Sequence, residues 1–374
     1  MGCETPPIRT RNSRFHDKRG DSVTTQTAQA AQAAKDERPL LSVQDLKIRI
    51  QMENGVMHAV DGVDFEIKKG KTLGLVGESG CGKSLTSRAI IGINPKECET
   101  TGTIGYDSAD AADSELNLLS LDPKGKRIRS IRGRKIAMIF QEPMTAFSPM
   151  YTIGNQIMEA IRTHRTKNKK EAKKIALEML GKVGISDQEK RFDQYPHEFS
   201  GGMRQRAMIS MALSCNPELL IADEPTTALD VTIQAQVLEL MQSLQREFGM
   251  AILLVTHDLG IIAEMCDEVA VMYLGKIVEQ APVKELFYNP KHPYTKGLLK
   301  SMPRLGGEKS VRLDSIEGSV PMPIDMPPMC GFYERCKDRI EGVCNVNAVP
   351  KTDISDQHTV RCFLYTDRPE GESP

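Results

Sequence analysis

The stretch Leu73 to Leu85, LGLVGESGCGKSL, constrains the fold of this chain more than any other. An apolar run typical of a buried parallel strand comes first, then a glycine-rich loop, then a helical pattern. The loop has the pattern G-x-x-x-x-G-K-S, and with the next residue it comprises Gly77, Glu78, Ser79, Gly80, Cys81, Gly82, Lys83, Ser84 and Leu85. Glycines let backbone N–H groups turn toward phosphate oxygens, and the helix N-terminus adds unpaired donors. The pattern therefore predicts a site for a nucleoside triphosphate such as ATP.

Two polar residues close the loop, and two more follow a second apolar strand. Lys83 is expected to neutralise the β- and γ-phosphates, and the Ser84 hydroxyl to bind Mg²⁺. The run 219–223 (LLIAD) ends in Asp223, which can bind Mg²⁺ directly or through water. Glu224 comes next and can polarise an attacking water. An apolar strand that ends in Asp-Glu is common, so this pair alone is weak support for catalysis.

The composition excludes several classes of protein. The 374 residues contain 49 Lys and Arg against 50 Asp and Glu, so no basic field suggests a nucleic-acid partner. No run approaches the ~18 apolar residues that a membrane helix needs. The polar start is not typical of a secretory signal. Met1-Gly2-Cys3 suggests acylation, but Pro6 stands where the myristoylation pattern has Ser or Thr, so we expect no lipid anchor.

The periodicity divides the chain into three parts. Residues 1–38 are poor in large apolar side chains and are predicted to form a disordered extension. Residues 39–288 begin with two antiparallel strands and then alternate strands and helices, which predicts an α/β domain with a mostly parallel sheet. A helical subdomain is expected at about 145–215. Residues 289–374, rich in Pro and Cys, are predicted to form a small loop-rich domain.

Ser200-Gly201-Gly202 precedes a predicted helix and has the composition of a second phosphate cradle. It cannot serve the nucleotide at Lys83 from the same side, which suggests a site completed by a second subunit. A serine at an ordinary helix N-cap has the same pattern, and in isolation the N-cap is favoured.

The whole set of motifs is more specific. Residues 199–206 (FSGGMRQR) resemble the signature of ATP-binding-cassette (ABC) ATPases. Together with the loop at 77–84, the order and spacing of Gln141, Asp223-Glu224, Ala228-Leu229-Asp230 and His257 resemble that family over residues 40–288. The resemblance implies the P-loop NTPase fold of ABC-type nucleotide-binding domains, with a mixed sheet, antiparallel strands at its N-terminal edge and a helical subdomain.

The resemblance also implies roles for the motif residues. Glu224 would be the general base and His257 the switch histidine that contacts the γ-phosphate. Gln141 would be the Q-loop glutamine and would bind Mg²⁺ with Ser84 and Asp223. The residues that would contact ATP or the partner across a dimer are Ser200, Gly201, Gly202, Met203 and the D-loop Asp230. Two features depart from the family: Met203 replaces a frequent Gln, and the aromatic that usually stacks on adenine is absent, with Ile50 as the best match.

Residues 289–299 (NPKHPYTKGLL) resemble the tail motif of the oligopeptide, dipeptide and nickel importers, as do VGESGCGKS and FQEPMTAFSPM. The resemblance implies an ATPase subunit for uptake of di- or oligopeptides, peripheral on the cytoplasmic face of the cell membrane. Its partners would be two membrane permeases, a homologous ATPase subunit and an extracytoplasmic solute-binding protein. Nickel import is the alternative within the branch. A soluble ABC ATPase that acts on ribosomes or DNA is disfavoured by the single cassette.

Four cysteines mark the C-terminal part: Cys330, Cys336, Cys344 and Cys362. Disulfides are disfavoured in the compartment expected for this chain. The spacing is loose for zinc, whereas four thiolates suit an iron–sulfur (4Fe–4S) cluster. Their arrangement resembles the cluster-bearing tails of the importer branch. A cluster, zinc and unligated thiols remain open, and Cys81 is interpreted as a small loop residue rather than a nucleophile.

Overall fold

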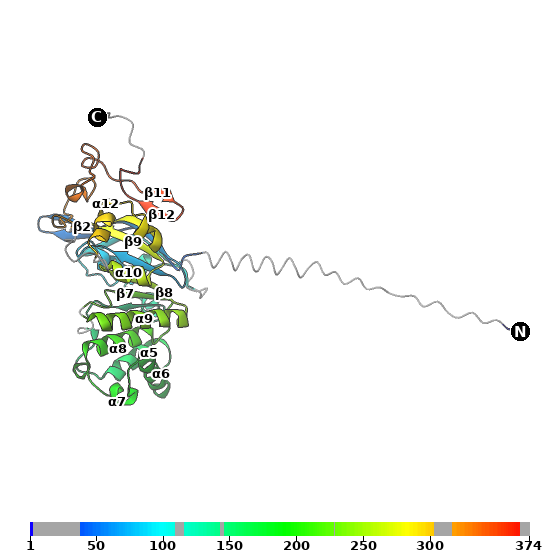
Figure 1. Cartoon of the computed structure of the whole chain (residues 1–374). Helices are drawn as coiled ribbons and strands as arrows, with labels where there is room; N and C mark the ends of the chain where they lie inside the picture. Colours follow the sequence, from blue (N-terminus) through cyan, green and yellow to red (C-terminus); the bar gives the residue numbers. More distant parts are fainter. Residues whose placement is uncertain (3–37, 109–115, 143–145, 228, 303–315, 367–374) are drawn as a thin grey trace. The chain divides into compact units, whose positions relative to one another are not determined.

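The computed structural model describes residues 1–2, 38–108, 116–142, 146–227, 229–302 and 316–366. By their contacts, residues 1–38 and 39–374 are separate units, and every helix and strand below belongs to the second (Figure 1). Most of the predicted extension, residues 3–37, lies outside the described residues, so its disorder stays a prediction.

An antiparallel sheet of four strands begins the second unit. Its order is β2-β1-β4-β5, with β1 (Leu41–Met52), β2 (Gly55–Ile67), β4 (Cys98–Tyr106) and β5 (Leu116–Asn117). The Asn54-Gly55 pair lies at the β1–β2 hairpin, where Gly55 has a positive φ of 138°. β4 is longer than its polar composition predicts, because it pairs with β1 along most of that strand's length.

A mixed sheet of eight strands carries the predicted motifs. Its order is β11-β12-β10-β9-β3-β8-β7-β6, and its strands are β3 (Thr72–Val76), β6 (Ile136–Ile139), β7 (Leu219–Asp223), β8 (Ala251–Thr256), β9 (Glu268–Tyr273), β10 (Lys276–Pro282), β11 (Thr352–Ser355) and β12 (His358–Val360). From β9 to β6 the neighbours are parallel, and β10, β12 and β11 extend the sheet in antiparallel fashion. β3, β7 and β8 are buried throughout, as expected for parallel strands covered on both faces.

Helices accompany the mixed sheet. They are α2 (Lys83–Ile90), α3 (Lys126–Ile131), α5 (Ile153–His164), α6 (Lys169–Lys182), α7 (Gln188–Phe192), α8 (Gly201–Leu213), α9 (Val231–Phe248), α10 (Leu259–Met265), α11 (Val283–Tyr288) and α12 (Pro293–Lys300), with short 3-10 helices η2 (Leu118–Ser120), η3 (Pro196–Glu198) and η4 (Tyr333–Arg335). α5 to α8 gather at one end of the unit, and β11 and β12 lie at the other (Figure 1). The apolar residues Ile175 and Met179 of α6 are buried, as is Val183 directly after the helix.

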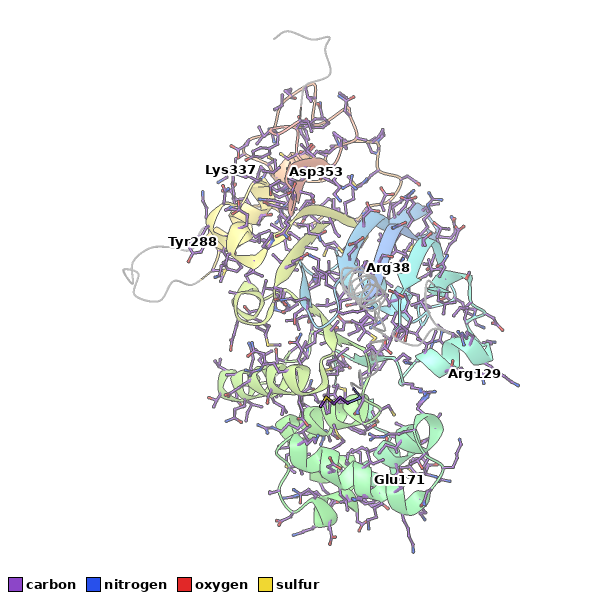
Figure 2. All side chains as sticks on the ribbon, turned by 90° about the vertical axis from the view of Figure 1, so that its right-hand side faces the viewer. Arg38, Arg129, Glu171, Tyr288, Lys337 and Asp353 are labelled. Carbon is purple, nitrogen blue, oxygen red and sulfur yellow. The ribbon has the colours of Figure 1, made fainter. Side chains whose placement is uncertain are left out.

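The C-terminal strands join the main sheet. β12 pairs with β10, so Glu279 and Gln280 are opposite Val360 and Thr359. The predicted boundary at residue 288 therefore falls inside one compact unit, and as a domain boundary it stays a prediction. In Figure 2, Glu171 on α6 and Lys337 in the C-terminal part lie at opposite ends of this unit. Within the described residues, none of the helices is both long and apolar enough to cross a membrane.

Candidate active site

The glycine-rich loop joins β3 to α2 at the carboxyl edge of the parallel strands. Lys83 is the first residue of α2, and its buried Nζ donates to the carbonyls of Gly77 at 2.8 Å and Glu78 at 3.0 Å. Gly82 has a φ of 101°, and a Cβ on it would lie 2.3 Å from the Ala59 carbonyl oxygen. Only glycine fits this backbone, so the loop shape depends on it.

A cavity of about 550 Å³ lies over the loop. The predicted residues that line it are Ser79, Gly80, Gly82, Lys83, Ser84, Leu85, Gln141 and Glu224. Gly77, Glu78 and Cys81 were also predicted to bind ATP, but they are not among the described residues that line the cavity. Cys81 is buried, and burial raises the pKa of its thiol, which agrees with its interpretation as a loop residue rather than a nucleophile.

Ser84 and Asp223 form a pair suited to Mg²⁺. The Ser84 hydroxyl donates to Asp223 Oδ1 at 2.9 Å. Asp223 is fully buried, and its Oδ2 has no hydrogen-bond partner among the described residues. Burial raises the pKa of this carboxyl, although the bond from Ser84 opposes the shift. A buried carboxylate oxygen without a partner costs free energy unless a cation or donor satisfies it, so the pair fits a hard divalent ion.

Glu224 is the centre of a hydrogen-bond network. Its Oε2 accepts from Gln141 Nε2 at 2.7 Å and from the Thr227 hydroxyl at 3.1 Å, and its Oε1 lies 3.0 Å from His257 Nδ1. Burial raises the pKa of this carboxyl, but the bonds from His257 and Thr227 outweigh burial, so the pKa lies below its usual value. Glu224 is therefore ionised at neutral pH. Its positive φ of 48° is uncommon for a non-glycine residue.

The structure thus brings together Gln141, Glu224 and His257, which are far apart in the sequence. Gln141 contacts Glu224, and no contact to Ser84 or Asp223 is present among the described residues, so its predicted role as a metal ligand stays a prediction. The motif around Gln141 includes residues 143–145, which lie outside the described residues.

The signature residues lie elsewhere. Ser200 is the N-cap of α8, where its side chain accepts from the Met203 N–H at 3.3 Å. Ser200 and Gly201 are exposed, and none of residues 200–203 is among the described residues that line the cavity over Lys83. Asp230 likewise caps α9 and accepts from the Ile233 N–H at 3.0 Å. Ala228, which belongs to the same motif, lies outside the described residues.

Several residues that line the cavity were missed by the sequence analysis. Met57 and Ala59 come from β2, and residues 320–323 come from the C-terminal part. Ile50, the predicted adenine contact, pairs with Met57 across the hairpin and is not among the described residues that line the cavity. The hairpin therefore presents Met57 to this cavity, which no sequence signal short of the strand register could have shown.

The four C-terminal cysteines come together. Cys330, Cys336, Cys344 and Cys362 line one small cavity, and the Cys330 N–H donates to the Cys344 carbonyl at 2.8 Å. Burial raises the pKa of the Cys330 thiol to about 12 and that of Cys362 to about 11. Across the described ranges, no group of three or more His, Cys, Asp or Glu side chains is placed to hold a single metal ion. The described geometry therefore shows no ready-made metal site, and a cluster, zinc and unligated thiols all stay open.

Comparisons with known proteins identify the family. Residues 60–227 match the family described as ABC transporter, and residues 278–344 match the C-terminal region of oligopeptide/dipeptide transporters. The dipeptide transport ATP-binding protein DppD of Bacillus subtilis (strain 168) is 49% identical over 333 residues, which is 88% of this chain and 96% of that protein. The chain belongs to the ABC transporter ATP-binding proteins. This ABC ATPase thus has the predicted α/β fold and the machinery for ATP hydrolysis.

Further relatives agree with this assignment. The oligopeptide transport ATP-binding protein AppD of Bacillus subtilis (strain 168) is 49% identical to the ABC ATPase over 334 residues, 89% of this chain and 99% of that protein. Among solved structures, the dimeric bacterial ABC transporter cassette MJ0796 is 25% identical with a TM-score of 0.56, over 65% of this chain and 98% of that one. CbiO1 of Clostridium perfringens, part of the transporter complex cbiONQ, is 27% identical with a TM-score of 0.55, over 68% of this chain and 92% of that one.

Proposed function

We propose that this ABC ATPase powers the uptake of di- and oligopeptides as a peripheral subunit on the cytoplasmic face of the cell membrane. The observation that carries the proposal is its similarity to dipeptide and oligopeptide transport ATP-binding proteins over 96% and 99% of their lengths. The similarity includes the C-terminal region of the same transporters. Its partners would be two permeases, a homologous ATPase subunit and an extracytoplasmic solute-binding protein.

The chemistry would proceed at Glu224. In the ionised state, this carboxylate accepts a proton from the water that attacks the γ-phosphate. His257 and Gln141 hold the carboxylate from two sides and couple its position to bound nucleotide. Lys83 Nζ donates to the carbonyls of Gly77 and Glu78, and its charge would neutralise the β- and γ-phosphates. Mg²⁺ held by Ser84 and Asp223 would neutralise charge on the β- and γ-phosphates.

A second subunit would complete each ATP site. Residues 200–203 present a helix N-terminus to solvent rather than to the Lys83 loop of their own chain. Such an N-terminus binds anions, so we propose that it faces the γ-phosphate held by the partner's loop. Asp230 at the start of α9 would lie at the same interface. Closure would then follow from the stronger binding of ATP to the dimer.

A permease would dock beside Gln141. A cavity of about 520 Å³ is lined by Phe140, Gln141, Met138 and two methionines of α8, Met208 and Met211. Arg88 and Glu142 also line it, so the lining is part apolar and part charged and suits an amphipathic segment of a membrane subunit. Because Gln141 borders this cavity and also bonds to Glu224, movement of the permease would reach the catalytic carboxylate through one side chain.

Uptake of labelled dipeptides, oligopeptides and nickel in cells that carry Lys83→Ala tests the function. Lys71→Ala is the matched control, since Lys71 is an exposed lysine in a surface ion pair with Asp267. We expect Lys83→Ala alone to abolish peptide uptake, because Lys83 holds the phosphates. Loss of nickel uptake without loss of peptide uptake would assign the chain to nickel import. Unchanged uptake of all three solutes would contradict the transporter function.

For the C-terminal cysteines we propose a 4Fe–4S cluster. Four thiols from separate positions around one cavity fit a group in which each cysteine binds a different iron, and need not meet at one ion. Bound iron would offset the burial that raises the pKa of Cys330 and Cys362 and would favour their thiolates. Anaerobic purification followed by iron, sulfide and zinc analysis and electron paramagnetic resonance tests this. Stoichiometric zinc, or protein without iron and sulfide after reconstitution, would overturn it.

A further inference from the structure

Glu78 is the second residue of the phosphate loop, and it is held from the C-terminal part of the chain. The two carboxylate oxygens accept from Arg335 in a bidentate pair, with distances of 2.6 Å to Nη1 and 2.9 Å to Nη2. Separately, the Glu78 backbone N–H donates to the Tyr294 hydroxyl at 2.9 Å. Two residues that are more than 200 positions away in sequence therefore fix one residue of the loop.

Arg335 is built into its place. Its side chain is only 6% exposed, and its Nε donates to the Glu317 carbonyl at 3.0 Å. The guanidinium lies 5.7 Å from the ring centre of Tyr273 and 5.9 Å from that of Phe332. A bidentate pair whose arginine is nearly buried has a fixed geometry, whereas a fully exposed surface pair contributes little. The contact therefore fixes the position of Glu78 in the loop relative to the C-terminal part.

Tyr294 is held as firmly. It is fully buried, and its ring packs against Tyr273 at 4.6 Å and Phe332 at 5.4 Å between ring centres. Its N–H donates to His292 Nδ1 at 3.1 Å, and burial lowers the pKa of His292 to about 3, so this ring is neutral and can accept. The aromatic cluster leaves the hydroxyl of Tyr294 aimed at Glu78.

Glu78 also touches the residue that binds phosphate. Its carbonyl accepts from Lys83 Nζ, so one residue joins Arg335 and Tyr294 on one side to Lys83 on the other. Gly80 and Gly82, with positive φ of 83° and 101°, give the loop a backbone shape that residues with a side chain rarely adopt. A loop that is not held must be ordered by ATP itself, at a cost in affinity.

We propose that Arg335 and Tyr294 are positioning residues that hold the phosphate loop through Glu78, so that the C-terminal part of the chain sets the affinity for ATP. The pair with Arg335 and the hydrogen bond from the Glu78 N–H to the Tyr294 hydroxyl would act together. The proposal depends on ATP binding at the loop and does not depend on which solute is transported. A failed peptide-uptake experiment would therefore leave it standing.

The test measures ATP affinity in the full chain carrying Glu224→Gln, which prevents turnover. Arg335→Ala and Glu78→Gln are each expected to raise the Kd for ATP roughly tenfold, or ~1.4 kcal/mol. Because both changes break the same pair, the double variant should bind no more weakly than either single variant. With Glu224 intact, KM should rise in each variant while kcat at saturating ATP stays within about twofold. Arg335→Lys, which keeps the charge, should recover part of the affinity.

Lys337→Ala is the matched control, since Lys337 (labelled in Figure 2) lies two residues after Arg335 and pairs with Glu317, with both side chains exposed. It should leave the Kd unchanged. Glu78→Gln leaves the C-terminal sequence intact, so it decides the question even if Arg335→Ala fails to fold. A Kd within about twofold of the parent for Glu78→Gln, or strictly additive effects in the double variant, would overturn the proposal.

Discussion

At the scale of single residues, two adjacent carboxyls are driven to different chemistry by their surroundings. Asp223 is fully buried beside Ser84, and burial raises the pKa of its carboxyl. Burial also raises the pKa of Glu224, but hydrogen bonds from His257 and Thr227 bring this pKa below its usual value. The first carboxyl has an oxygen without a partner among the described residues and suits a cation, and the second stays ionised and suits proton transfer.

Glu224→Gln should leave ATP binding intact and reduce kcat by ~10²-fold or more, because the amide cannot accept the proton from water. Turnover by phosphate release and Kd by nucleotide binding are the measurements. Glu247→Gln serves as control, since Glu247 pairs with Lys182 at the surface. A variant at 224 with near-parental turnover would exclude this residue as the base.

The pH dependence follows from the same network. Because the pKa of Glu224 lies below its usual value, activity should persist at mildly acidic pH and fall as the pH drops through that pKa. His257→Ala removes the hydrogen bond and charge that lower the pKa, so the acid limb of the pH–kcat profile should move to higher pH. An acid limb at the same pH in both proteins would contradict this assignment.

At the scale of elements, glycine positions decide how closely segments approach. Gly154 lies in α5 directly under Phe192 of α7, and a Cβ there would come within 2.3 Å of the ring. A side chain at this position therefore forces α7 away from α5, which explains a glycine inside a helix that would otherwise favour alanine.

Gly154→Ala should lower the free energy of unfolding by ~1–3 kcal/mol through this overpacking. Denaturant unfolding of the full chain measures it. Gly201→Ala is the matched control for stability, because the space around Gly201 is open. A Gly154→Ala variant as stable as the parent would contradict this prediction, because α7 would then move away from α5 without a loss of stability.

At the scale of the whole molecule, one buried carboxylate joins the C-terminal part to the main sheet. Glu279 of β10 accepts from the N–H groups of Lys291 and His292, and it pairs with His358 of β12 at 2.8 Å. Glu279 and His358 are almost completely buried, so each of these polar side chains depends on the other as a partner.

Glu279→Ala should therefore destabilise the chain by at least ~1–3 kcal/mol, the usual cost of leaving a buried hydrogen-bonding group without its partner. Thermal or denaturant unfolding provides the measurement. Glu317→Ala, at an exposed pair with Lys337, should change stability little. Equal stability of the two variants would show that the C-terminal strands are held by other contacts.

The local sequence determined much of this molecule. Apolar runs predicted β3, β7 and β8, and glycine and lysine spacing predicted the loop at 77–84, because these features depend on neighbours within a few residues. The signature at 199–206 and the C-terminal motif at 289–299 indicate the family without any knowledge of the fold. The polar strand β4 was underestimated, because its length depends on pairing with β1 rather than on its own composition.

Only the tertiary structure decided which distant residues meet. Three contacts join segments that are separated by tens to hundreds of residues. Glu224 contacts Gln141 and His257, Arg335 pairs with Glu78, and Met57 lines the cavity over the phosphate loop. Periodicity reports which face of an element is buried, but it carries no information about which other element covers that face. The loop could therefore be found from sequence, whereas the partner that holds it could not.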